Sequence, residues 1–278
     1  MEHQLVPPAS GARWAAKVLA GIVQSGVTMP GGGRAAPRVR LAGALRANGG
    51  VAELRLAVNG GGEADALVFA YPSFSAEDAR RLEVEAKSSA RLACACALQF
   101  EPAALDRFCG VAADPPRGVP LFAVKVHPDS LLDHLLRDIP SSHAFSAVGL
   151  PAVEGKMDGP GRGRVLFHGS WVPVVEAGGA VSWHLVPPTS HDALFVDPSF
   201  DGRVVRPRVA LSLAKRGHWW RLKASGRQEG AGGAAPGTAV AATPPFPLGD
   251  HDQVAVAVID WLGSQVTRAL ARDCFRFP

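Results

Sequence analysis

One stretch of the chain, residues 164–224, restricts the fold more than any other, because two β-hairpins can be drawn in it. The first pairs Arg164–Val175 with Ala180–Val186, and the second pairs Val204–Leu213 with Trp219–Ala224. Valine, tryptophan, phenylalanine and leucine dominate these runs, which is typical of half-buried strands. Glycine in both turns reaches the positive φ that a tight hairpin needs. We therefore predict that this stretch forms the core sheet of the C-terminal half.

The N-terminal half contains a second group of strand signals. Apolar runs at Val39–Ala47, Val51–Val58 and Ala66–Tyr71 are separated by glycine-rich turns, which predicts an antiparallel meander. A further strand is predicted at Val119–Val126, whereas Leu92–Phe100 fits a helix or a strand equally well.

Four helices are predicted around these strands. The first begins at Ser10 and runs to about Gln24, and the second begins at Ser75, where an acid three residues later resembles a capping box. A short helix follows Asp129. The last is predicted from Asp250 to about Arg272, because an apolar face recurs at helical spacing and would dock on the body.

The element order predicts an α+β fold with mainly antiparallel β-sheets, three or four flanking helices and a docked C-terminal helix. Residues 1–127 would form an N-terminal αβ module and residues 128–278 a β-rich module with the basic hairpin and the final helix. One continuous domain is the alternative. The segment Ser225–Pro247 is low in complexity and is predicted to be a linker or mobile loop.

The composition excludes several classes of protein. Of the residues, 47% are hydrophobic and 19% charged, which predicts a folded chain and not a disordered one. No apolar run is long enough to span a membrane, and the N-terminus lacks the pattern of a secretory signal. We therefore expect an intracellular, cytoplasmic protein. Arginine outnumbers lysine, as is typical of a GC-rich genome.

The cysteines predict neither a disulfide nor a metal site. Cys94 and Cys96 form a C-x-C pair, but no second pair lies at zinc-ligand spacing. The glycine-rich run at 159–164 does not follow a strand and open a helix, as a dinucleotide fingerprint must. We expect no metal and no cofactor.

A basic stretch in the second predicted hairpin carries the strongest functional signal. Between Gly202 and Gln228 there is no acid, and a net charge of only +4 makes this local clustering informative. Cations bind phosphates or carboxylates, and an exposed indole can stack on a base. An ordinary amphipathic hairpin is the alternative. The predicted anion- or nucleic-acid-binding residues are Arg203, Arg206, Arg208, Lys215, Arg216, Trp219, Trp220, Arg221 and Lys223.

A second constellation is His184 followed by Asp197 in the sequence Asp-Pro-Ser. This segment resembles the strand-turn-strand of transglutaminase-like and papain-like cysteine proteases, in which an aspartate orients a histidine. The resemblance implies that His184 is the base and Asp197 its partner, with Cys109 as the nucleophile. Cys109 lacks a clear helix start after it, and a histidine beside a strand-ending turn is the alternative.

A third pattern has the letters of the PD-(D/E)-x-K nuclease signature. Pro128-Asp129 and Glu154-Gly155-Lys156 resemble it, and the resemblance implies that the two acids hold Mg²⁺. We expect Glu154–Lys156 in a glycine-rich loop, whereas that family places this part of the motif on a strand.

These patterns together favour a non-enzymatic binding or assembly protein, whose basic, tryptophan-bearing hairpin engages nucleic acid or an acidic protein surface. A role as a subunit of a larger complex stays open. The alternatives are a hydrolase or transferase that uses His184 and Asp197, and a metal-dependent nuclease.

Overall fold

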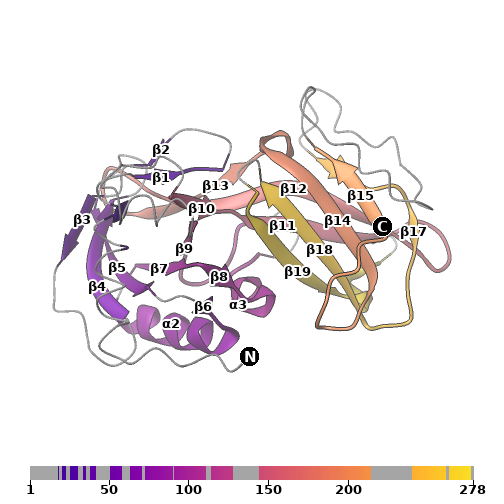
Figure 1. Ribbon diagram of the computed structural model, residues 1–278, viewed down its shortest axis with the longest axis horizontal. Helices are drawn as coiled ribbons and strands as arrows, with labels where there is room; N and C mark the ends of the chain where they lie inside the picture. The colour runs from indigo at the N-terminus through magenta and orange to yellow at the C-terminus, as the bar shows by residue number, and fades with distance from the viewer. Residues whose placement is uncertain are drawn as a thin grey trace. The chain divides into compact units, whose positions relative to one another are not determined.

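Figure 1 shows a computed structural model of the chain, which describes residues 18, 21–22, 26–30, 34–35, 38–41, 51–57, 63–70, 73–89, 91–110, 114–127, 144–213, 240–260 and 263–276. The chain divides into two compact units built from alternating segments. The first unit comprises residues 1–108, 117–148 and 172–184, and the second comprises 109–116, 149–171 and 185–278. The boundary predicted at residue 127 is a single cut, whereas these segments alternate.

The first unit is built on one eight-stranded sheet in the order β2-β1-β10-β9-β7-β5-β4-β3. Its strands are β1 Val27–Thr28, β2 Arg34–Ala35, β3 Arg38–Leu41, β4 Val51–Ala57, β5 Glu63–Ala70, β7 Leu92–Ala97, β9 Leu121–Val126 and β10 Phe145–Val148. Strands β3, β4 and β5 pair antiparallel, which confirms the predicted meander. Strands β5, β7 and β9 pair parallel, so the centre of the sheet is parallel.

Helix α2, Ala76–Ser89, connects β5 to β7 and packs against both strands. The predicted capping box is confirmed: the Ser75 hydroxyl accepts the N–H of Asp78 at 3.2 Å, and the Asp78 carboxylate accepts the N–H of Ser75 at 3.0 Å. Ala79, Leu82 and Ala86 recur on one face and are buried. This local pattern is strong enough to define the helix from the sequence.

The other predicted N-terminal elements have different outcomes. Val18, Gly21 and Ile22 are helical, and Val18 and Ile22 are buried, which agrees with the helix predicted from Ser10 to about Gln24. Leu92–Phe100 is not a helix: it forms β7 and then β8, Gln99–Phe100, which pairs with β6, Ser73–Phe74. A short helix α3, Pro102–Asp106, follows. The helix predicted after Asp129 lies outside the described residues.

The strands of the second unit lie in two antiparallel sheets (Figure 1). Residues 172–175 and 181–184 of the first of these sheets are counted with the first unit. One contains β11, β12 and β13, with β16 and β17 also paired to β12, and the other has the order β15-β14-β18-β19. The bounds are β11 Leu150–Met157, β12 Arg162–Val175, β13 Val181–Val186, β14 His191–Phe200, β15 Val209–Ser212, β16 Ala241–Ala242, β17 Phe246–Pro247, β18 Gln253–Asp260 and β19 Gln265–Ala271. Two 3₁₀ turns, Pro188–Ser190 and Arg272–Cys274, complete the unit.

The core of the second unit takes side chains from both sheets. Val153, Val165 and Phe167 come from the sheet of β11 and β12, and Leu194 and Val256 come from the sheet of β14 and β18. All five are buried in one cluster. Two sheets that share a core in this way form a β-sandwich.

Both predicted C-terminal hairpins can be compared with these strands. The first is confirmed, because β12 and β13 are hydrogen-bonded neighbours joined by a turn in which Gly179 has φ 77°. In the second, only Val209–Ser212 of the first arm is a strand, and it pairs with β14. The partner arm predicted at Trp219–Ala224 lies outside the described residues.

The prediction of a C-terminal helix from Asp250 to about Arg272 is wrong. Residues 253–260 and 265–271 are the strands β18 and β19, which pair antiparallel from Gln253 opposite Ala271 to Ile259 opposite Gln265. Gly263, with φ 76°, makes the turn between them. Valines spaced four apart satisfy a period of two as well as a helical one, and β-branched side chains favour strands. The prediction of three or four flanking helices is also wrong, since only two helices have bounds in the described chain.

The structure of the described residues is thus mainly β and its sheets are largely antiparallel. None of the helices in these ranges has the length and apolar character needed to cross a membrane.

Candidate functional site

A pocket of about 520 Å³ opens at one end of the β-sandwich unit. Two segments line it: the end of β14 with the start of β15, and the proline-rich run from Pro244 to Asp250. Its residues are Pro198, Ser199, Arg208, Val209, Pro244, Pro245, Phe246, Pro247, Leu248, Gly249 and Asp250. Ligand sites in proteins have volumes of about 300–1,000 Å³ and combine an apolar lining with a few polar groups. This pocket has both properties.

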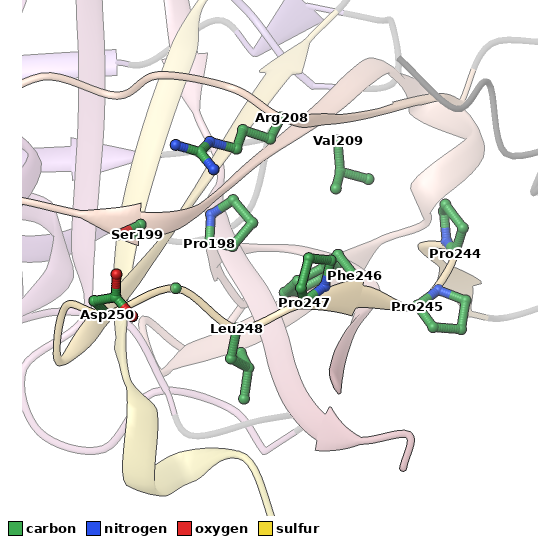
Figure 2. A pocket seen from close by; sticks show the side chains of 11 residues that line it. Pro198, Ser199, Arg208, Val209, Pro244, Pro245, Phe246, Pro247, Leu248 and Asp250 are labelled. Carbon is green, nitrogen blue, oxygen red and sulfur yellow. The ribbon is translucent and has the colours of Figure 1, made fainter. Parts of the chain in front are cut away.

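The polar groups of the pocket are gathered at one end. In Figure 2, the side chains of Arg208, Ser199 and Asp250 lie toward one end, and Pro244 and Pro245 lie at the other. Arg208 and Asp250 are exposed, and in the described chain neither side chain makes an ion pair. The site therefore offers one unpaired cation and one unpaired anion beside an apolar wall.

A β-bulge in β14 opens the pocket. Asp197 pairs with Ala255 and Phe200 with Gln253, so β14 holds one residue more than β18 between these pairs. The extra residue turns Pro198 and Ser199 out of the regular ladder, as bulges next to binding sites commonly do.

The proline-rich wall is held in place from three directions. The N–H of Gly249 donates to the carbonyl of Pro198 at 3.0 Å, and the N–H of Leu248 donates to Gly161 at 2.9 Å. The Arg162 guanidinium donates to the carbonyl of Pro245 at 3.2 Å. The run 240–247, predicted to belong to a mobile loop, is therefore a paired segment that contains β16 and β17. Residues 225–239 lie outside the described residues.

Asp197 fixes the bulge and the basic segment together. Its side chain is 1% exposed, and its two oxygens accept the N–H of Ser199 at 3.1 Å and the N–H of Arg206 at 2.7 Å. One buried carboxylate thus positions the pocket wall at Ser199 and the backbone that carries the arginines.

Asp201 orders the connection at residues 203–206. Its carboxylate accepts the N–H of Arg203 at 2.9 Å and of Val204 at 3.1 Å, and pairs with the Arg206 guanidinium at 2.9 Å. These donors lower the pKa of Asp201 to about 2, and the N–H of Arg203 has the largest effect. Asp201 therefore stays ionised and holds the turn at any ordinary pH.

The structure describes three of the predicted anion-binding residues. Arg203, Arg206 and Arg208 are all exposed on the connection between β14 and β15. Arg206 is paired with Asp201, whereas the guanidinium groups of Arg203 and Arg208 make no ion pair within the described ranges. The other predicted residues lie outside the described ranges: Lys215, Arg216, Trp219, Trp220, Arg221 and Lys223.

The residues of the cysteine-protease resemblance are distributed over both units. His184 is exposed on β13 and belongs to the first unit, whereas Asp197 and the half-buried Cys109 belong to the second. The Asp197 oxygens are engaged by two backbone amides, as described above. The assignment of these three residues to catalysis stays a prediction.

The structure describes one of the two parts of the nuclease-like pattern and corrects its placement. Glu154-Gly155-Lys156 lies on strand β11, so its predicted placement in a glycine-rich loop is wrong. The ring of Phe275 packs over Gly155, where an added Cβ would lie 2.8 Å from it, so the glycine leaves room for this ring. The Glu154 carboxylate lies 3.5 Å from Lys156 Nζ and 3.4 Å from His168 Nε2. Pro128 and Asp129 lie outside the described residues.

A buried serine–histidine pair was not predicted from the sequence. His191 Nε2 lies 2.9 Å from Ser170 Oγ, and His191 Nδ1 lies 3.1 Å from the carbonyl oxygen of Pro187. Because a carbonyl only accepts, Nδ1 carries the proton and Nε2 accepts the serine O–H. Burial lowers the pKa of His191 from 6.5 to about 4, against the opposing effect of the backbone at Pro187 and Pro188.

This pair has the chemistry of a nucleophile and its base, but both residues are almost fully buried, at 1% for Ser170 and 3% for His191. Ser170 lies on β12 and His191 on β14, so the hydrogen bond joins the two sheets. The ring of Phe167 packs edge-on against His191 at 5.0 Å. The pair therefore has a structural role between the sheets. The two residues lie 21 positions apart in the sequence, and no local sequence pattern predicts that they are in contact.

Comparison with known proteins gives no match to a protein-family model, to a curated protein or to a solved structure.

Proposed function

We propose that the protein is a non-enzymatic binding or assembly protein, whose β-sandwich unit engages an anionic partner through the basic segment 203–223. The observation that carries the proposal is the exposure of Arg203, Arg206 and Arg208 on one short connection beside the pocket. Asp197 and Asp201 hold the backbone of that connection, so the cations are presented from an ordered segment. Ordered cations lose less conformational entropy when a partner binds.

Electrostatic contact predicts a strong dependence on salt. Each contact between an arginine and a polyanion releases counterions, so the affinity should fall steeply as the salt concentration rises. The test measures binding to single-stranded DNA, double-stranded DNA and polyglutamate over a range of salt concentrations. We expect at least one of these polyanions to bind and to weaken with salt.

Two triple variants locate the contact, and a third controls for net charge. We expect R203A/R206A/R208A and R216A/R221A/K223A to weaken binding and to reduce its salt dependence. The matched control, R80A/R117A/R272A, removes the same charge from exposed arginines of other elements and should bind like the wild type. Equal losses in the control, or binding insensitive to salt, would contradict the proposal.

A further inference from the structure

We propose that the pocket between the β14 bulge and the proline-rich wall binds a short peptide of a partner protein, with a large apolar side chain next to one acidic side chain. The inference rests on the proposed function and names the partner as a protein segment. A peptide that carries both an apolar and an acidic side chain fits this pocket because its two ends have different chemistry (Figure 2).

The apolar end suits a large side chain. Pro244, Pro245 and Phe246 form a wall, and Val209 stands across from them in Figure 2. Their ring and methyl surfaces carry no hydrogen-bonding side-chain groups that a buried aromatic residue would leave unpaired. Aromatic anchors in desolvated pockets commonly contribute most of the binding energy of an interface.

The polar end suits one carboxylate. The guanidinium of Arg208, which makes no ion pair with any described residue, can donate two parallel N–H bonds to a carboxylate, the geometry in which arginine binds this group best. Ser199 beside it supplies a hydroxyl. The backbone N–H of Arg208 donates to the Val196 carbonyl at 2.8 Å, so the backbone that carries this arginine is fixed to β14.

Asp250 argues against nucleic acid as the occupant of the pocket. This exposed acid lines the same end as Arg208, and Asp252 follows two residues later. A phosphate backbone brings several negative charges close together, and these acids would repel the charges that Arg208 does not neutralise. A peptide with a single acid brings only one negative charge, and its backbone N–H groups can donate to the Asp250 carboxylate.

The wall is already formed, which favours a specific ligand over a loosely held one. Gly249 approaches Ser199 so closely that an added Cβ would lie 2.3 Å from the Ser199 Cβ. The backbone bonds of Leu248 and Gly249 hold the same segment. A site that needs no rearrangement loses little affinity to ordering.

The test uses three capped tetrapeptides and calorimetry on the full chain. The probe is acetyl-Gly-Trp-Asp-Gly-amide, and its matched controls replace Asp by Asn or Trp by Ala. We expect the probe to bind with a dissociation constant of about 1 mM or lower. Each control should bind about tenfold more weakly, because one loses the charge-assisted bond and the other loses the apolar anchor.

Two single variants assign the carboxylate contact. R208A should remove the difference between the Asp and Asn peptides, whereas R117A, which removes an exposed arginine outside the basic segment, should preserve it. Hydrogen exchange should show protection of residues 244–250 on binding. Equal affinities for the Asp and Asn peptides, an unchanged preference in R208A, or no binding of any peptide would overturn the inference.

The remaining outcomes separate this inference from the proposed function. Tight binding of N-acetyl-tryptophan, equal to that of the tetrapeptide, would replace the peptide by a small aromatic acid. If oligothymidylate displaced the tetrapeptide and lost affinity in R208A, nucleic acid would be the occupant of the pocket. Salt-dependent polyanion binding without tetrapeptide binding would overturn only the proposal of a peptide site in the pocket. If neither the polyanions nor the tetrapeptide bound, the peptide site and the anion-binding function would both be overturned.

Discussion

Acidification should destabilise the second unit through the single residue His191. The folded protein holds this imidazole neutral, because its ring is buried between the two sheets and its Nε2 accepts the Ser170 hydroxyl. Its pKa is lowered from 6.5 to about 4 by burial. In the unfolded chain the ring binds a proton at higher pH than in the folded chain. The stabilisation is therefore complete above about pH 7 and is lost as the pH falls from 6.5 toward about 4.

The size of the effect follows from this difference in pKa. One pKa unit corresponds to about 1.4 kcal/mol, so a shift from 6.5 to about 4 sets a limit of about 3 kcal/mol. Between about pH 7 and about pH 5, the linkage relation gives a loss of about 2 kcal/mol in the free energy of unfolding. This is a sizeable part of the stability of an ordinary domain, about 5–15 kcal/mol.

The assay measures urea unfolding of the second unit at both pH values, with hydrogen exchange of β14 and β18 as the readout. Carboxylates also titrate in this range, and burial raises the pKa of the neighbouring Asp192, which acts in the opposite direction. Comparison with H191Q removes these contributions, because both proteins retain every carboxylate. We expect the wild type to lose about 2 kcal/mol more than H191Q. A variant at the exposed His251 of the same unit, H251Q, should behave like the wild type, and equal losses in wild type and H191Q would refute the reasoning.

Three further predictions concern the packing of the same unit and are measured by its urea unfolding at neutral pH. Asp197→Asn should lower the free energy of unfolding by about 1.5–3 kcal/mol, because one of the two backbone N–H donors loses its charged, buried acceptor; a neutral effect would show that these bonds do not hold the bulge. Gly249→Ala should cost about 1–3 kcal/mol through overlap with Ser199, and a neutral effect would contradict the close approach. Leu194→Ala should cost about 2–5 kcal/mol by leaving a cavity between the sheets, and a loss below about 1 kcal/mol would place this side chain outside the core.

The proposed binding surface was only partly predictable. The run without acids from Gly202 to Gln228 indicated a cationic segment, and the three described arginines in it are exposed. The pocket beside them was not predicted, because its two walls are about 40 residues apart and meet through the β14 bulge and the Gly249–Pro198 hydrogen bond. The prolines around Phe246 are the part of the sequence that could have indicated this pocket, but their low-complexity surroundings predict a linker.

Local interactions explain what the sequence determined by itself. Helix α2 begins at Ser75 because the capping partner lies three residues away, and the β3–β4–β5 meander and the β12–β13 turn depend on neighbouring glycine-bearing segments. Tertiary structure decided the rest. Valines at 254 and 258 suit either periodicity, and pairing with β14 and β19 makes them part of a strand. The parallel core strand β7, the His191–Ser170 contact and the pocket likewise require segments that are distant in sequence, whose pairing leaves no periodic trace in either segment alone.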